Sequence, residues 1–343
     1  MTRLVFVTQH VDPGHPALAA TVPKIRALAA RVDELVVLAL SAAPAELPPN
    51  CRVRTFGASS RLGRGVRFAA ALAAELRARP LGVVAHMCPI YAVLAAPLAR
   101  PLRVPVLLWY THWNATMVLR LAERLSTGIV SVEHRSFPLA SRKVTGIGHG
   151  IDLSEFPCFP ARGGEGLRLL ALGRTSPAKG YPAVIEAVRL AAARGADVTL
   201  ELRGPSLTEE ERAHSAELRR LAGGRVTVAE AVPRTEVPML LAGVDALVNN
   251  MRAGAPDKVV YEAAASCRPV LASNPVFDEL FAGIEPPLAF DREDPLSLAG
   301  RIETLAALSA EERTAIGRTL RERVEERHSV DSWADGVLRV LAV

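Results

Sequence analysis

The sequence contains little of what marks several common protein classes. Four cysteines in 343 residues follow no CxxC or Cys/His spacing: Cys51, Cys88, Cys158 and Cys267. We therefore expect neither a zinc site nor a disulfide framework, but reduced and mostly buried thiols. No apolar stretch reaches the length of a membrane span, and the strand-like start at residues 3–7 is too short for the core of a signal peptide. These absences favour a cytoplasmic location.

Motifs for common cofactors are also missing. The chain has no P-loop motif and no GxGxxG segment after a predicted strand, so a nicotinamide or flavin site is poorly supported. No carboxylate cluster in the sequence argues for a metal ion. We expect a protein without a bound cofactor or metal.

Acidic residues are scarce in the first half of the chain. Residues 1–150 carry 18 lysines and arginines but 7 aspartates and glutamates, a balance of +11, whereas the rest sums to −6. Seven of these arginines lie between Arg52 and Arg79. Such a patch can bind nucleic acid, anionic lipid or acidic small molecules, or can be a solvated face. It lacks interleaved aromatic residues, so we expect no nucleic-acid partner and keep peripheral association with the inner face of an anionic membrane open.

Short apolar strands alternate with amphipathic helices along the chain, which predicts parallel sheets covered on both faces. Predicted strands lie at 4–8, 34–40, 52–56, 82–86, 104–110, 128–132, 167–172, 197–203, 225–229, 246–248 and 269–272. Predicted helices lie at 17–30, 62–78, 91–98, 115–125, 182–193, 208–221, 236–242, 296–308, 310–326 and 330–343. The fold class is therefore α/β, with two doubly wound Rossmann-like domains facing across a cleft. We place the domains at 1–150 and 167–325, a hinge at 151–166, and a terminal helix at 326–343 that is a candidate to cross back to the N-terminal domain.

The stretch from Met251 to Asn274 reads as loop, helix and strand. Pro256 suits a helix start, and Asp257 then falls in the first turn, where the helix dipole favours a carboxylate. Lys258 and Glu262 are four residues apart and share a helix face, so they could also form a simple surface pair. A carboxylate here lies beside the carboxyl ends of parallel strands, where doubly wound sheets bind ligands.

The loop from Gly173 to Gly180 joins a predicted strand to a helix. Backbone N–H groups at such a turn can face an anion, and Arg174 and Lys179 add two positive charges to the same place. This chemistry suits a diphosphate. The alternative is that both side chains are solvated loop charges.

Together these residues resemble the donor-binding half of glycosyltransferase family 4 (glycosyl transferases group 1), the retaining enzymes of the GT-B fold. The resemblance rests on Gly173-Arg174 with Lys179-Gly180, followed by Glu262 and Pro269-Val270. Two earlier segments agree with it: Val104-Pro105-Val106 running into Tyr110-Thr111-His112, and Gly148-His149-Gly150-Ile151-Asp152 with Phe156.

The resemblance implies an N-terminal acceptor-binding domain and a C-terminal domain that binds a nucleotide sugar. Arg174 and Lys179 would bind the donor diphosphate, Glu262 the ribose hydroxyls, and His112 would approach the transferred sugar. Further contacts to sugar or phosphate are assigned to Gly14, Asp257 and Lys258.

The implied enzyme is a metal-independent hexosyltransferase that retains configuration and uses a small-molecule, glycan or lipid-linked acceptor. The family commonly has a second glutamate eight residues before the ribose-binding one, where this chain has Gly254, and this leaves sugar choice and activity open. A sugar-nucleotide epimerase and a noncatalytic protein that binds a nucleotide sugar or a membrane surface are the alternatives.

Overall fold

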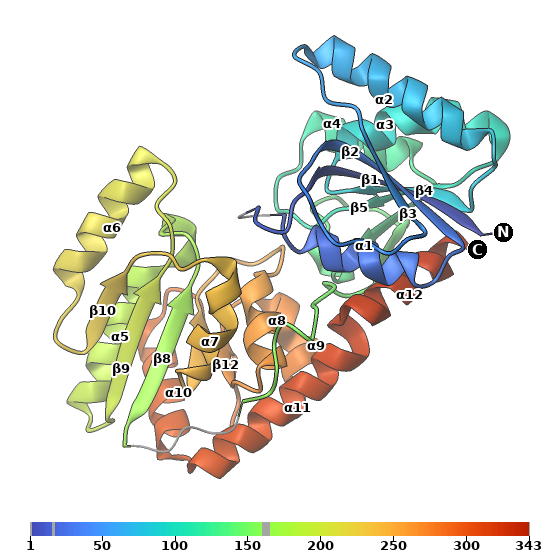
Figure 1. The fold of residues 1–343 in the computed structure, drawn as a ribbon. Helices are drawn as coiled ribbons and strands as arrows, with labels where there is room; N and C mark the ends of the chain where they lie inside the picture. The colour runs from blue at the N-terminus through green and yellow to red at the C-terminus, as the bar shows by residue number, and fades with distance from the viewer. Residues whose placement is uncertain (1, 16–17, 160–164, 343) are drawn as a thin grey trace. The chain divides into compact units, whose positions relative to one another are not determined.

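The computed structural model describes residues 2–15, 18–159 and 165–342. The chain divides into two compact units: Met1–Asp152 with Arg327–Val343 form unit 1, and Leu153–Glu326 form unit 2. Each unit is a parallel sheet with helices on both faces (Figure 1), so the predicted doubly wound α/β class is confirmed. The predicted domain roles and the hinge at 151–166 stay predictions. Residues 160–164 of that hinge lie outside the described residues, as do residue 17 of the first predicted helix and residue 343 of the last.

Unit 1 contains a seven-stranded sheet in the order β3-β2-β1-β4-β5-β6-β7. The strands are β1 (Arg3–Val11), β2 (Glu34–Ala42), β3 (Cys51–Thr55), β4 (Gly82–His86), β5 (Val106–Trp109), β6 (Gly128–Ser131) and β7 (Val144–Gly146). β7 was not predicted, since its three residues are too few to show a pattern. The strand order reverses between β1 and β4, which are neighbours, so the switch point of this sheet lies at their carboxyl ends.

Helices cover both faces of the unit 1 sheet. α2 (Arg61–Leu76), α3 (Pro89–Ala99) and α4 (Met117–Leu125) lie on one face and share a core with Val5 and Val7 of β1 (Figure 1). α1 (Thr21–Ala29) and α12 (Val330–Leu341) pack together on the other. There the buried Trp333 meets Phe6 edge-on, with ring centroids 6.4 Å apart. The last helix therefore belongs to the core of unit 1.

Unit 2 contains a five-stranded sheet in the order β10-β9-β8-β11-β12. The strands are β8 (Leu167–Leu172), β9 (Val198–Arg203), β10 (Val226–Ala229), β11 (Ala246–Asn249) and β12 (Val270–Ala272). The helices are α5 (Tyr181–Ala193), α6 (Glu209–Leu221), α7 (Val237–Ala242), α8 (Lys258–Ala265), α9 (Asp278–Phe281), α10 (Pro295–Ala307) and α11 (Ala310–His328). The strand order reverses between β8 and β11, which sets the switch point of unit 2 at their carboxyl ends.

Cys158 and Cys267 form a disulfide within unit 2. The expectation of four reduced thiols is therefore wrong for this pair, while Cys51 and Cys88 are free. The two bonded cysteines are 109 residues apart, so no local spacing could have revealed them. Within the described residues, every helix is too short or too polar to cross a lipid bilayer.

Candidate active site

The loops after β8 and β11 meet at the switch point of unit 2. They leave the sheet at the same edge because the two strands are neighbours and parallel. Lys179 in the first loop forms an ion pair with Asp257 in the second, and Asn249 Nδ2 donates to Asp257 Oδ2 at 2.8 Å. The structure thus brings together two of the predicted site residues, Lys179 and Asp257.

Two glycines let the backbone close around the Lys179 ammonium. A Cβ on Gly173, whose φ is +142°, would lie 2.7 Å from Lys179 Nζ. A Cβ on Gly204 would lie 1.9 Å from the Gly173 carbonyl oxygen. The buried Tyr181 hydroxyl donates to that same oxygen at 3.2 Å. Lys179 is only 8 % exposed, so it is not the solvated loop charge that the sequence left as an alternative.

Arg174 turns to a different acid. Its Nη2 lies 2.6 Å from Oε1 of the buried Glu211. Glu211 is fixed by a capping box at the start of α6, in which Thr208 Oγ1 accepts from the Glu211 N–H at 3.2 Å. Burial raises the pKa of Glu211, but the Leu207 N–H and Arg174 outweigh it and hold the pKa below its usual value. Half of the Arg174 side chain stays exposed beside the Gly173 loop, so it is held in place and still accessible.

The start of α8 differs from the prediction. The sequence predicts a helix from Pro256 with Asp257 in its first turn, whereas α8 begins at Lys258 and Asp257 precedes it with φ −82° and ψ 122°. The Asp257 side chain accepts no hydrogen bond from the helix, because its carboxylate is directed to Lys179 and Asn249. Asp257 therefore connects the two loops instead of capping the helix.

Glu262 lies in the second turn of α8 and is 5 % exposed. Its Oε1 is 2.7 Å from Lys258 Nζ and 2.8 Å from Arg234 Nη1. Burial raises the pKa of Glu262, but these two cations outweigh burial and lower it, which keeps the carboxylate ionised. Burial lowers the pKa of Lys258, although Glu262 opposes that change. The pair of Lys258 and Glu262 thus exists, but its acid is buried and not a surface residue.

Arg234 is a site residue that the sequence analysis missed. It lies in the short helix Arg234–Glu236, and its Nη2 is 2.9 Å from Glu155 Oε2 while Nη1 contacts Glu262. Arg234 also lies over the Phe156 ring, 5.6 Å from its centroid. No sequence motif predicts a role for this arginine, because Arg234 and Glu262 are far apart in the sequence and come into contact only in the folded structure. Among the described residues Glu262 Oε2 has no hydrogen-bond partner, so one oxygen is fixed and the other is available.

Gly254 lies where the resemblance would place a second glutamate. Its φ is +119°, a value that favours glycine, and its carbonyl oxygen accepts from Asn274 Nδ2 at 3.3 Å. A glutamate at this position would be strained in the observed loop.

The two candidates in unit 1 follow strands of its sheet. His112 comes three residues after β5, its Nδ1 accepts from the Asn114 N–H at 3.1 Å, and its ring stacks on Trp113 at 4.9 Å. Gly14 follows β1 and donates its N–H to Asp12 Oδ1 at 2.8 Å. Both residues lie in the loops predicted for them, and their roles stay predictions.

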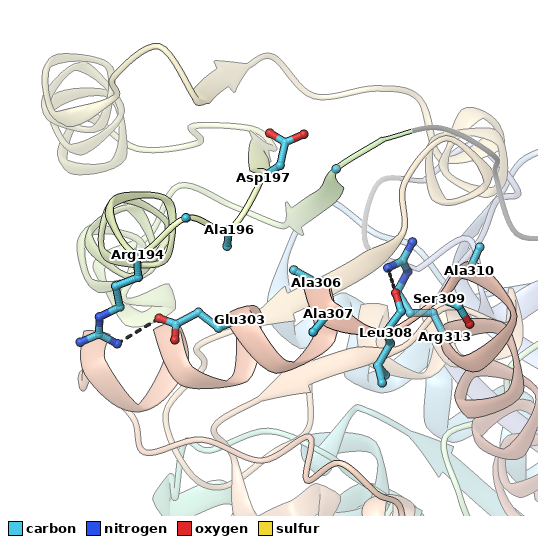
Figure 2. Close-up of a pocket in the computed structure, with 12 residues that line it drawn as sticks. Arg194, Ala196, Asp197, Glu303, Ala306, Ala307, Leu308, Ser309, Ala310 and Arg313 are labelled. Carbon is cyan, nitrogen blue, oxygen red and sulfur yellow. Dashed lines mark hydrogen bonds and ion pairs between the residues drawn. The ribbon is translucent and has the colours of Figure 1, made fainter.

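A cavity of about 600 Å³ lies at the other end of the unit 2 sheet (Figure 2). It is lined by residues that precede β8 and β9, including Gly166 and Asp197, and by residues from α10 to the start of α11. Arg194 Nη1 and Glu303 Oε1 form an ion pair of 3.0 Å at its edge. Doubly wound sheets bind ligands at the carboxyl ends of their strands, so we do not assign the donor to this cavity. In the part of the chain that the structure describes, no three His, Cys, Asp or Glu side chains are grouped to hold a metal ion.

Comparison with known proteins gives a family match for most of unit 2. Residues 166–307 match the family described as glycosyl transferases group 1. The matched range contains Arg174, Lys179, Arg234 and Glu262. The sequence matches none of the curated proteins with which it was compared.

Solved structures match along the whole chain. HepE of Anabaena, solved in complex with UDP, is 17% identical with a TM-score of 0.75, and the match covers 100% of both chains. Sucrose-phosphate synthase from Thermosynechococcus elongatus is 17% identical with a TM-score of 0.72, covering 100% of this chain and 98% of that one. A glycosyltransferase from Rickettsia africae is 12% identical with a TM-score of 0.74, covering 99% and 97%. These likenesses establish the fold, which is the GT-B fold expected from the sequence.

Proposed function

We propose that this protein transfers a sugar from a nucleoside diphosphate sugar to an acceptor hydroxyl, with retention of configuration. The match of residues 166–307 to the glycosyl transferases group 1 family supports this proposal. One observation carries the proposal. At the switch point of unit 2, the buried Lys179 lies beside the start of α8, and the same helix holds the ionised Glu262 with one oxygen available.

Lys179 and Arg174 are the groups proposed to bind the donor diphosphate. Negative charge grows on the oxygens of this leaving group as the bond to the sugar breaks, and fixed positive charges stabilise it. Lys179 has three N–H donors and uses Asp257 as one partner, so it can contact a phosphate without leaving that ion pair. This stabilisation requires no metal ion, and we propose a metal-independent hexosyltransferase without a cofactor.

Glu262 is the group proposed to hold the ribose. An ionised carboxylate only accepts hydrogen bonds, which matches the donating ribose hydroxyls. Lys258 and Arg234 fix Oε1 and leave Oε2 for the ligand. HepE was solved with UDP, and an E. coli structure matched to this chain was solved with UDP-2-fluoro glucose. Uridine donors are therefore the first candidates.

His112 is proposed to approach the transferred sugar, and Gly14, Asp257 and Lys258 to contact sugar or phosphate. The acceptor would attack from the face on which the diphosphate leaves, which gives retention without a covalent intermediate. A small molecule, a glycan or a lipid-linked acceptor remains open, in a protein that we expect in the cytoplasm or at the inner face of the membrane. One observation favours a noncatalytic sugar-nucleotide binding protein as the second candidate: Gly254 supplies no carboxylate for the sugar hydroxyls.

Incubation with nucleotide sugars and candidate acceptors, followed by mass analysis, tests the proposal. A new glycoside that forms with release of nucleoside diphosphate is the expected result. Isomerised donor would instead identify an epimerase. Binding of donor without turnover in any acceptor mixture would favour the noncatalytic candidate.

A further inference from the structure

Six large apolar side chains are exposed on one helical layer of unit 1. Leu62 is 80%, Met117 79% and Val66 61% exposed, and three more are at least 41% exposed. We call this set the apolar rim: Leu62 and Val66 of α2, Ile90 of α3, and Met117, Val118 and Leu121 of α4. Single exposed apolar residues are normal, whereas a group of six on adjacent helices indicates an interaction surface.

The topology places the whole rim at one end of that layer. All six residues lie in the first two turns of their helices. Along the chain, each of these helices connects two parallel strands of the same sheet. Each helix therefore begins at the carboxyl edge of that sheet. α3 packs against both α2 and α4, and Figure 1 shows the three helices on the same face. The rim is therefore one surface shared by three adjacent helices.

The segment that contains the apolar rim is strongly basic. Residues 51–130 contain eleven arginines, no lysine, and two acidic residues, Glu75 and Glu123. Glu75 is buried and already bound by Arg52 and Arg54, with N–O distances of 3.0 and 2.6 Å. Glu123 accepts a hydrogen bond from Ser141. Neither acid neutralises the arginines that flank the rim.

Three of these arginines adjoin the rim directly. Arg61 precedes Leu62, while Arg120 and Arg124 flank Leu121 on α4. All three are exposed, and among the described residues no acidic side chain pairs with them. Apolar side chains beside unpaired arginines are complementary to a surface that is anionic outside and apolar within.

We propose that the apolar rim and its arginines dock unit 1 onto an anionic lipid bilayer. The rim side chains would enter the boundary between headgroups and acyl chains, and the arginines would bind headgroup phosphates. A second copy of this chain would bring arginines against arginines, which disfavours a dimer through this face. Docking does not depend on the proposed transferase activity.

If the protein is that transferase, docking favours a lipid-linked acceptor. His112 lies five residues before Met117 and would therefore be near the headgroups.

Sedimentation with vesicles tests this surface. The full-length protein is mixed with vesicles of phosphatidylglycerol and phosphatidylcholine, or of phosphatidylcholine alone, at low and high salt. Leu62→Asp/Met117→Asp removes apolar contacts and adds charge, and Arg120→Gln/Arg124→Gln removes charge only. Met239→Asp is the matched control, because Met239 is 66% exposed on α7 of unit 2.

The wild type should bind the anionic vesicles at low salt and lose binding at high salt or without anionic lipid. Each arginine near an anionic surface contributes about fivefold in affinity, so the double glutamine variant should bind roughly 25-fold more weakly. The double aspartate variant should lose binding, and Met239→Asp should match the wild type. Unchanged thermal unfolding and nucleotide binding would show that the variants are folded. No binding to anionic vesicles, or equal binding by all four proteins, would overturn the proposal.

Discussion

Lys179 is a buried cation whose charge is balanced by Asp257 alone among the described side chains, and this governs how its removal should act. Hydrogen bonds to charged groups contribute about 1.5–3 kcal/mol, so Lys179→Ala should weaken nucleoside diphosphate binding by roughly ten- to a hundredfold. It should also destabilise unit 2, because it leaves the Asp257 carboxylate without its cation. Calorimetric titration and urea unfolding measure the two effects.

Asp257→Asn separates these two roles of Lys179. In Lys179→Ala/Asp257→Asn the carboxylate is gone, so most of the lost stability should return while nucleotide binding stays weak. Recovery of binding in the double variant would contradict the direct role of Lys179.

The second prediction compares Glu262, which is proposed to contact the nucleotide, with Glu155, which would act only by positioning Arg234. Glu262→Gln removes the charge that holds Lys258 and Arg234 and should weaken nucleotide binding by about tenfold or more. Glu155→Gln removes only the far partner of Arg234, so it should weaken binding by a smaller factor. Titration with a nucleoside diphosphate compares them. Equal losses from both variants would mean that Glu262 acts through the packing of Arg234 and not by contact.

His328 should make unit 1 sensitive to acid. Burial, with a smaller contribution from Arg327, lowers the pKa of His328 to about 3 from the ordinary 6.5. Between these two pKa values the unfolded chain binds a proton on His328 that the folded chain does not bind. The contribution of His328 to the free energy of unfolding is therefore fully present above pH 6.5 and is lost as the pH falls towards 3. The slope should be roughly 1 kcal/mol per pH unit below pH 6. Urea unfolding at several pH values should show a flatter profile for His328→Asn, and equal slopes would contradict the assignment.

At the scale of elements, α12 is the helix whose loss should matter most to unit 1. Trp333 is fully buried between Phe6 and Trp109, and the Lys24 ammonium lies 5.0 Å from its ring. Trp333→Ala should cost about 3–5 kcal/mol by leaving a cavity. Arg339→Ala, on the exposed side of the same helix, should cost little. Urea unfolding that gives similar values for both would contradict this packing.

Most elements could be predicted from the sequence, whereas the contacts between them could not. The strands after Leu167 and Ala246 were predicted because buried parallel strands are apolar runs. Thr208 and Glu211 have the spacing of a capping box, which marks the start of α6 but gives no sign that Arg174 binds Glu211. Asp257 was predicted in the first turn of α8 but directly precedes the helix, since its pairing with Lys179 depends on the neighbouring loop. Arg234 had no local signal at all.

At the scale of the whole molecule, each unit has one sheet with one switch point. The proposed donor site lies at the switch point of unit 2. Hydrogen exchange with and without nucleoside diphosphate can locate the ligand. Exchange should slow in peptides that cover 173–181 and 249–262. It should be unchanged in peptides from the cavity of Figure 2, such as 194–197 and 303–313. The reverse pattern would move the donor to that cavity.

Calorimetric titration with UDP, GDP and ADP tests the central claim most directly, on the wild type, Lys179→Ala, Glu262→Gln and the surface control Arg189→Ala. We predict that one nucleotide binds the wild type and Arg189→Ala equally at one site per chain, and binds the other two variants at least about tenfold more weakly. Binding of none of the nucleotides, or equal binding by all four proteins, would contradict the donor site at the switch point of unit 2.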